Sequence, residues 1–243
     1  MIRSFDTLRN AFSTLRPCRI CGGPVRHFSR EYSRIPVCPA CLGASRRLIP
    51  PRCTVCGRPL ISEITVCTVC RERPYPFSEH RSLYEYRGNV KFLIRLFKFS
   101  QVPTLAPFFA DRLAEELHIL IPRGGNRTPV VVPVPGNPAS VRGRGWDQVE
   151  LISRYLVQNH GFTVAGILRR GRSKTQKSLG FDSRTKNLEG KIRVVARGGT
   201  AGVPRDIILL DDVFTTGSTA AECTRVLLRA GAERVRVLTL AID

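Results

Sequence analysis

The sequence lacks any long apolar run. No stretch approaches the roughly 18 apolar residues that a membrane-spanning helix needs, and a short run such as 130–134 is interrupted by proline. The amino-terminal segment also lacks the continuous apolar core of a secretory signal peptide. Both absences argue against a membrane-spanning or exported chain. We therefore expect a cytoplasmic protein.

The first 17 residues carry an amphipathic pattern instead. Apolar side chains recur there at helical spacing, at Ile2, Phe5, Leu8, Phe12 and Leu15. Such a stripe can lie on a membrane or on a translocation partner, which would place the protein peripherally at the inner membrane. More often a short stripe packs against its own protein, and we favour that interpretation.

Lysine and acidic residues are scarce. Lysine and arginine total 39 against 19 acids, giving a formal charge of +20, and only six of the 39 are lysines. No lysine occurs before position 81, where thirteen arginines stand against five acids. Since guanidinium groups pair with phosphate oxygens and stack on bases, the skew favours nucleic acid, and single-stranded DNA in particular, as a partner. Eight of these arginines could follow a nucleic-acid backbone: Arg19, Arg26, Arg30, Arg34, Arg46, Arg47, Arg52 and Arg58. The aromatic residues that could stack on bases are Phe28, Tyr32 and Tyr75.

Eight of the nine cysteines form four C-x-x-C pairs. Two intervening residues let both sulfurs face one tetrahedral zinc ion, and disulfides are unexpected without a secretory signal. Glycine follows the first and third pairs, as in a zinc knuckle, so we assign consecutive pairs to each site. An interleaved pairing stays open, and iron–sulfur ligation and redox catalysis are weaker alternatives. The predicted zinc ligands are Cys18, Cys21, Cys38 and Cys41 in one site and Cys53, Cys56, Cys67 and Cys70 in the other. The ninth cysteine, Cys223, is predicted to be a small buried apolar residue.

The cysteine pairs define a small domain at 18–76 that is held together by metal more than by a core. Small ribbons of this kind also bind proteins, so a protein partner remains an alternative to nucleic acid. From 80 to 243 the pattern alternates between strand and helix, which predicts a mainly parallel sheet with helices on both faces. The predicted strands are 83–86, 129–134, 162–168, 207–212 and 235–242, and the predicted helical segments are 90–99, 104–121, 146–159 and 218–230.

The stretch 206–219, D-I-I-L-L-D-D-V-F-T-T-G-S-T, is the most informative part of the chain. Its aliphatic run predicts a buried strand that ends on Asp211 and Asp212, followed by a small-residue turn and a helix. Ligands of open α/β sheets bind where strands end and helices begin. Hydroxyls, backbone N–H groups and a helix start can cradle a phosphate, while the two carboxylates can accept from vicinal hydroxyls or hold a divalent metal. Together they predict a ribose 5-phosphate site, whose phosphate-binding residues are Thr215, Thr216, Gly217, Ser218 and Thr219.

Two further loops carry candidate ligand groups. After the strand at 129–134, R-G-R-G-W-D-Q places Arg142 and Arg144 where they could meet a pyrophosphate. A long polar loop follows position 168, and loops of this length are usually lids or binding elements. Its candidate lid residues are Gln176, Arg184 and Asn187. A solvated basic surface is the alternative for both loops.

The 206–219 stretch resembles the phosphoribosyl-pyrophosphate (PRPP) motif of type I phosphoribosyltransferases. Together with the C-x-x-C pairs, R-G-R-G-W-D-Q and Q-x2-L-x4-R-x2-N, it resembles the ComF family of competence-associated proteins across nearly the whole chain. The resemblance implies a zinc ribbon followed by a type I phosphoribosyltransferase fold, and a role in handling single-stranded DNA during natural transformation with the DNA-uptake machinery. The chain departs from the family pattern at 146–148, where Trp-Asp-Gln stands for Phe-Asn-Gln and adds a charge beside the expected pyrophosphate site.

Two functions follow as hypotheses. In the first, the protein is a transferase that passes phosphoribosyl from PRPP, with Mg²⁺, to an unknown acceptor. Asp211 and Asp212 would then be its catalytic residues, orienting the ribose hydroxyls beside an oxocarbenium-like transition state. In the second, the fold is a scaffold or sensor, and arginine-rich surfaces hold single-stranded DNA.

Overall fold

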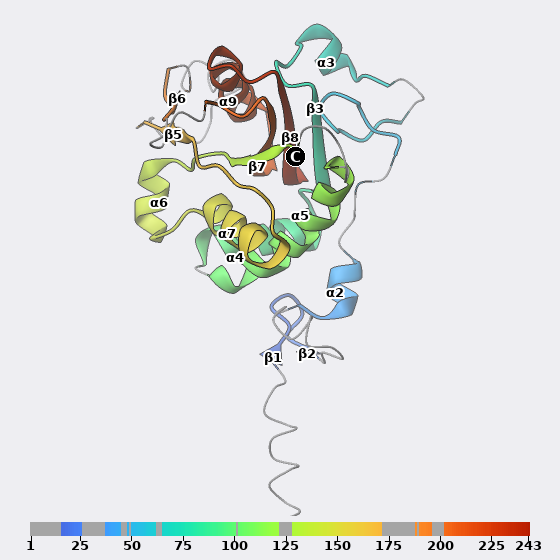
Figure 1. The fold of residues 1–243 in the computed structure, drawn as a ribbon. Coiled ribbons are helices and arrows are strands. Elements are labelled where there is room, and N and C mark those ends of the chain that lie inside the picture. Colours follow the sequence, from blue (N-terminus) through green and yellow to red (C-terminus); the bar gives the residue numbers. More distant parts are fainter. Residues whose placement is uncertain are drawn as a thin grey trace, which may run out of the picture.

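The structure is a computed structural model that describes residues 16–25, 37–44, 48, 50–61, 65–100, 102–121, 128–171, 188, 190–195 and 202–243. The cysteine-rich part contains short elements only. These are β1 (Arg16–Pro17), β2 (Pro24–Val25), α2 (Pro39–Gly43) and α3 (Thr68–Glu72). Figure 1 shows β1, β2 and α2 below the main body of the protein, whereas α3 lies at its opposite end beside β3.

The main body is built on a four-stranded sheet in which every pair is parallel. The strand order is β3 (Glu79–Glu85), β8 (Arg234–Ile242), β7 (Asp206–Phe214) and β4 (Val130–Pro133). β7 therefore lies inside the sheet, which explains why its aliphatic run is continuous rather than alternating.

Each face of the sheet buries a separate core. Ile208 and Leu210 of β7 pack on one face with α4 (Gly88–Phe99), α5 (Ala106–Leu120) and α7 (Gln148–His160). Ile207 and Leu209 pack on the other face with α9 (Ser218–Arg229) and with Cys53, Cys56 and Cys70. Figure 1 shows α4, α5 and α7 on one side of the strands and α9 on the other. The cysteine region around α3 thus covers part of a sheet face.

Three smaller elements complete the described chain. A 3-10 turn, η1 (Pro103–Leu105), leads into α5, and α6 (Pro138–Arg144) follows β4. β5 (Leu168–Arg170) and β6 (Ile192–Val194) form an antiparallel pair next to α9. No helix in these described ranges combines the length and apolar content needed to cross a bilayer. The amphipathic stripe at 2–15 lies outside the described residues.

The predicted fold class, a mainly parallel sheet with helices on both faces, is confirmed, with differences at three strands. β3 begins at Glu79, four residues before the predicted start at position 83. β7 continues past Asp212 to Phe214, because Val213 and Phe214 still pair with Ala241 and Ile242 of β8. The predicted strand at 162–168 is reduced to a bridge between Val164 and Val131, after which the chain turns away to pair with β6. Cys223 is fully buried, as expected of a small apolar residue.

Candidate ribose-phosphate site and cysteine clusters

The loop between β7 and α9 forms a compact turn of polar groups. The Thr216 and Ser218 hydroxyls lie 2.9 Å apart, and the Ser218 N–H donates to Thr216 Oγ1 at 3.4 Å. Gly217 has a φ of +73°, which favours glycine, and a Cβ there would lie 2.5 Å from Phe214 Cζ. The turn opens a 12-residue helix, whose first N–H groups have no partner within the helix. Hydroxyls and helix start therefore meet as a phosphate cradle requires.

Asp211 and Asp212 occupy the carboxyl-terminal part of β7, where successive side chains point to opposite faces of the sheet. Asp212 forms an ion pair with Lys98 of α4, in which Lys98 Nζ and Asp212 Oδ1 lie 2.8 Å apart. Asp211 accepts the Asp212 backbone N–H at 2.8 Å and is electrostatically coupled to Arg170 and Cys223. The two carboxylates thus flank the end of β7 from either side.

Asp211 and Asp212 have different electrostatic surroundings. Burial, reinforced by the charge of Asp212, raises the pKa of Asp211 from 3.8 to about 7, although part of the residue remains accessible to solvent. Burial disfavours the Lys98 ammonium, but the Asp212 carboxylate outweighs that effect and raises the pKa of Lys98. The site thus holds the Lys98–Asp212 ion pair beside Asp211, an acid close to its titration midpoint at neutral pH.

The loop after β4 is held by Asp147, one of the two residues at which the chain departs from the family pattern. Asp147 Oδ1 accepts from the Val149 and Glu150 N–H groups and caps α7, while Oδ2 accepts from the Gly136 N–H at 2.8 Å. A Cβ on Gly136 would lie 2.4 Å from that oxygen. Three backbone N–H groups therefore donate to the Asp147 carboxylate. The added negative charge is compensated by these donors, and the carboxylate holds the loop in place.

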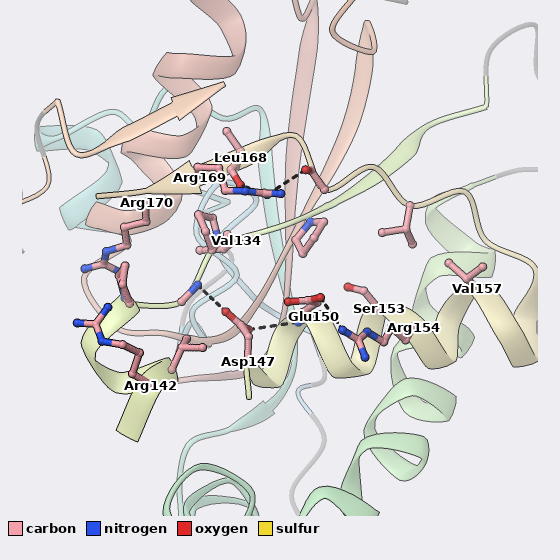
Figure 2. A pocket seen from close by; sticks show the side chains of 17 residues that line it. Val134, Arg142, Asp147, Glu150, Ser153, Arg154, Val157, Leu168, Arg169 and Arg170 are labelled. Atoms are coloured by element: carbon pink, nitrogen blue, oxygen red, sulfur yellow. Dashed lines mark hydrogen bonds and ion pairs between the residues drawn. The ribbon is translucent and has the colours of Figure 1, made fainter. Parts of the chain in front are cut away.

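The two predicted pyrophosphate arginines differ in placement. Arg144 donates to Gln148 Oε1 at 2.7 Å, and its buried Nε has no hydrogen-bond partner among the described residues. Arg142 is exposed and lines a cavity of about 600 Å³ beside the end of β4. Figure 2 shows Arg142 and Arg170 at one end of this cavity and Arg154 at the other, with Asp147 between them. Asp147 and Arg170, which line the cavity, both interact electrostatically with Asp211. Gln176, Arg184 and Asn187 lie outside the described residues.

The eight paired cysteines gather into two four-sulfur clusters, Cys18, Cys21, Cys38 and Cys41 and then Cys53, Cys56, Cys67 and Cys70. This confirms the pairing of consecutive motifs over the interleaved one. The sulfurs of each cluster lie within 4.8 Å of one another, and Sγ–Sγ distances of 3.7 Å join Cys21 to Cys38 and Cys56 to Cys67. A tetrahedral zinc ion with Zn–S bonds of about 2.3 Å requires sulfurs about 3.8 Å apart. Both clusters therefore fit zinc.

Backbone donors prepare the first cysteine of each cluster for a metal. The Cys38 N–H points at Cys18 Sγ and the Cys67 N–H at Cys53 Sγ, both at 3.3 Å. Burial opposes ionisation of these thiols, but the N–H donors outweigh it and lower the pKa of Cys18 to about 6 and that of Cys53 to about 7. At neutral pH these two thiols are therefore more ionised than an ordinary cysteine, and thiolate is the form that binds zinc.

Sequence reasoning missed two residues of the site. Lys98 was placed only within the predicted helical segment 90–99, although it is one of just six lysines in the chain. Tyr75 was expected to stack on nucleic-acid bases. Its ring instead stacks on Phe77 and its hydroxyl donates to the Thr216 carbonyl at 2.9 Å, which leaves it unsuited to that role.

Comparison with known proteins gives consistent relatives, although no family model matches the chain. DNA utilization protein YhgH of Salmonella typhi is 29% identical over 209 residues, covering 84% of this chain and 89% of the relative. Competence protein ComFC of Streptococcus pneumoniae is 27% identical, covering 84% and 86%, and Competence protein F of Haemophilus influenzae is 27% identical, covering 83% and 89%.

Among solved structures, the adenine phosphoribosyltransferase of Leishmania tarentolae is 16% identical, with a TM-score of 0.33 and coverage of 61% of this chain and 75% of that one. A hypoxanthine phosphoribosyltransferase from Staphylococcus aureus is 9% identical, with a TM-score of 0.31 and coverage of 59% and 64%.

Proposed function

Because this chain belongs to the ComF family, we propose that it binds PRPP or a related ribose 5-phosphate and handles single-stranded DNA during natural transformation. The observation that carries the sugar-phosphate part is the end of β7. A hydroxyl-lined turn, a helix start and two carboxylates meet there within one short segment. A helix cap alone would need one hydroxyl residue and no acid pair.

In this proposal the 5-phosphate lies on the turn formed by 215–219. Backbone N–H groups at the start of α9 and the hydroxyls of Thr216 and Ser218 would neutralise its oxygens. The ribose then extends over the end of β7, where Asp211 and Asp212 flank it and accept from its hydroxyls. To accept from a ribose hydroxyl, Asp212 must release Lys98 or bind the hydroxyl and Lys98 together. The Lys98 ammonium can then also contact an anionic substituent of the sugar. Mg²⁺ bound with PRPP would supply further charge neutralisation for the pyrophosphate.

The cavity beside β4 is the natural place for the remainder of such a ligand. Its lining residue Arg170 interacts electrostatically with Asp211, and the guanidinium groups of Arg142 and Arg170 lie at one end. Guanidinium groups are suited to bidentate contacts with phosphate oxygens, so this end suits a pyrophosphate. The lining also contains apolar side chains, among them Val157, Val164 and Leu168.

Calorimetric titration of PRPP with Mg²⁺ into the zinc-loaded protein tests the sugar-phosphate proposal. The informative variant is Asp211→Asn, which keeps the acceptor for the Asp212 N–H, and the matched control is Asp111→Asn on α5. We expect binding to the wild type and the control and at least tenfold weaker binding to Asp211→Asn. No binding to the wild type would reject the proposal.

The single-stranded DNA proposal rests on charge. Arg58, Arg71 and Arg73 all lie exposed in the second cysteine region. Replacing the three with glutamine should reduce the slope of log affinity against log salt by about 2, since each lost phosphate contact removes about 0.7. The control replaces three exposed arginines elsewhere, Arg95, Arg193 and Arg229, and removes the same charge. Equal slopes for both triple variants would reject a DNA role for this region.

A second function, phosphoribosyl transfer to an acceptor, is favoured by one observation. The cavity has room beyond a pyrophosphate, and the apolar side chains in its lining could hold an acceptor. Pyrophosphate release from PRPP, measured with candidate nucleobases and with single-stranded DNA, tests it. Release that Asp211→Asn abolishes supports a transferase, whereas binding without release leaves a sugar-phosphate sensor.

A further inference from the structure

The second cysteine cluster, Cys53, Cys56, Cys67 and Cys70, is joined to the sheet by hydrogen bonds. The His80 N–H of β3 donates to the Val55 carbonyl at 2.8 Å, and His80 Nδ1 lies 2.6 Å from the carbonyl oxygen of Cys56. His80 is buried, and its Nε2 lies 2.9 Å from Thr239 Oγ1 on β8. A Cβ on Gly57 would lie 2.8 Å from the His80 carbonyl oxygen, so the turn after Cys56 is pressed against the strand. The second cluster and β3 therefore form one packed unit.

An aromatic cluster extends this unit to the end of β7. The His80 ring stacks on Phe214 with centroids 4.1 Å apart, and Tyr75 stacks on Phe77 at 4.8 Å. Tyr75 and Phe77 each meet Phe214 edge-on, at 5.8 and 6.1 Å. Phe77 and Phe214 are buried in the same core as Cys53, Cys56 and Cys70. Phe214 is also the last residue of β7. The turn at 215–219, here called the phosphate turn, follows it.

Tyr75 then contacts the phosphate turn directly. Its hydroxyl donates to the carbonyl of Thr216 at 2.9 Å, across 141 residues of sequence. Its ring also limits the space at Gly217, where a Cβ would lie 2.7 Å from Tyr75 Cε1. A trans peptide unit points its C=O and N–H in opposite directions. Holding the Thr216 carbonyl toward Tyr75 therefore turns the Gly217 N–H away from the aromatic cluster, toward the open side of the turn.

We infer that Tyr75 is a positioning residue for the phosphate turn, and that it makes the folding of the second cysteine cluster on its metal a condition for tight phosphate binding. Zinc held by these four thiolates fixes α3 and the chain that leaves it, and this chain places Tyr75. The first cluster, Cys18, Cys21, Cys38 and Cys41, has no such connection to the turn among the described residues. The inference rests on the proposed sugar-phosphate function for the identity of the ligand. The positioning itself can be measured without any ligand.

The test compares Tyr75→Phe with Tyr155→Phe, which removes a hydroxyl from α7 instead. Both variants keep all eight zinc ligands. In the ligand-free protein, amide hydrogen exchange of peptides covering 214–221 should be faster in Tyr75→Phe than in the wild type and unchanged in Tyr155→Phe. Affinity for PRPP with Mg²⁺ should fall about two- to tenfold in Tyr75→Phe only, the range expected for one hydrogen bond. Zinc content, measured by release to a chromogenic chelator, should be equal in all three proteins.

Unchanged exchange at 214–221 in Tyr75→Phe would overturn the inference, and so would unchanged PRPP affinity in a wild type that binds PRPP. If the wild type does not bind PRPP but exchange responds as expected, the proposed ligand fails while the positioning role stands. Stepwise chelation gives an independent measurement. Exchange at 214–221 should rise when the second cluster loses its metal and not when the first does, with Cys21→Ser and Cys56→Ser identifying each step. Equal responses to the two losses would also overturn the inference.

Discussion

The two cysteine clusters have the same ligand chemistry and differ in their surroundings. Three cysteines of the second cluster are buried and lie in the core that covers one face of the sheet. In the first cluster only Cys18 is buried and Cys21 is exposed. Figure 1 shows the elements of the first cluster, β1, β2 and α2, apart from the strands, whereas α3 lies beside them. Cys18 nevertheless lies in the core on the opposite face of the sheet, so identical metal chemistry serves a more exposed module in one case and a deeply buried one in the other.

The largest expected effect separates these two roles. Cys21 and Cys56 are the second cysteines of their motifs, and each lies 3.7 Å from a partner sulfur. A structural zinc site contributes about 10–16 kcal/mol to the folding of the part it organises. Cys56→Ser should therefore lower the main thermal transition by more than about 10 °C, because three cysteines of the second cluster are buried in the sheet core and only one of the first is. Cys21→Ser should leave that transition within about 2 °C and abolish only the local zinc site. Scanning calorimetry with zinc analysis measures both, and equal losses would contradict the comparison.

The next effect concerns Lys98 of α4, which contacts Asp212 from the sheet face opposite the second cluster. Lys98→Met removes the cation from a largely buried ion pair and leaves the Asp212 carboxylate uncompensated. Loss of one partner from a buried pair costs about 3 kcal/mol. The control is Lys91→Met on the same helix, where the ammonium is exposed and lies over the Tyr86 ring at 5.6 Å. Urea unfolding should show the full loss for Lys98→Met and less than about 1 kcal/mol for Lys91→Met. Similar small losses would mean that solvent already screens the Asp212 charge.

The third effect, at Asp211, is a gain in stability relative to the wild type rather than a loss. The folded protein raises the pKa of Asp211 from 3.8 to about 7, so between these values it binds more protons than the unfolded chain. Stability therefore falls as pH rises through that window and changes no further above about pH 7. Asp211→Asn removes the titration, so its stability relative to the wild type should increase from pH 4 to pH 7 and then level off. Thermal unfolding from pH 4 to pH 8 checks this. A difference independent of pH would show that Asp211 ionises normally in the folded protein.

The sequence predicts the parts of this molecule that depend on local pattern. The aliphatic run of β7, the small-residue turn before α9 and the four C-x-x-C pairs each specify their structure within a few residues. The sequence does not reveal contacts between distant segments, because side-chain partners across the fold leave no spacing to read. Tyr75 meets Thr216 across 141 positions and Lys98 meets Asp212 across 114. The same limitation explains why the sequence treats Asp211 and Asp212 as one pair. Because they alternate along β7, Asp212 forms an ion pair with Lys98, whereas Asp211 interacts electrostatically with Arg170.

The smallest expected effect tests whether the first cluster is coupled to the site by a different route. Asn89, near the start of α4, donates from Nδ2 to the Cys41 carbonyl at 2.9 Å, and the same helix carries Lys98 nine residues later. A rigid helix could transmit a displacement over that span of about 14 Å. We expect it not to, because α4 is fixed along its length by the buried side chains of Val90, Leu93, Ile94 and Phe97. Asn89→Ala should then cost at most about 1 kcal/mol of stability and leave hydrogen exchange at 214–221 unchanged. Faster exchange in this variant would mean that both clusters act on the phosphate turn, one through Tyr75 and the other through α4.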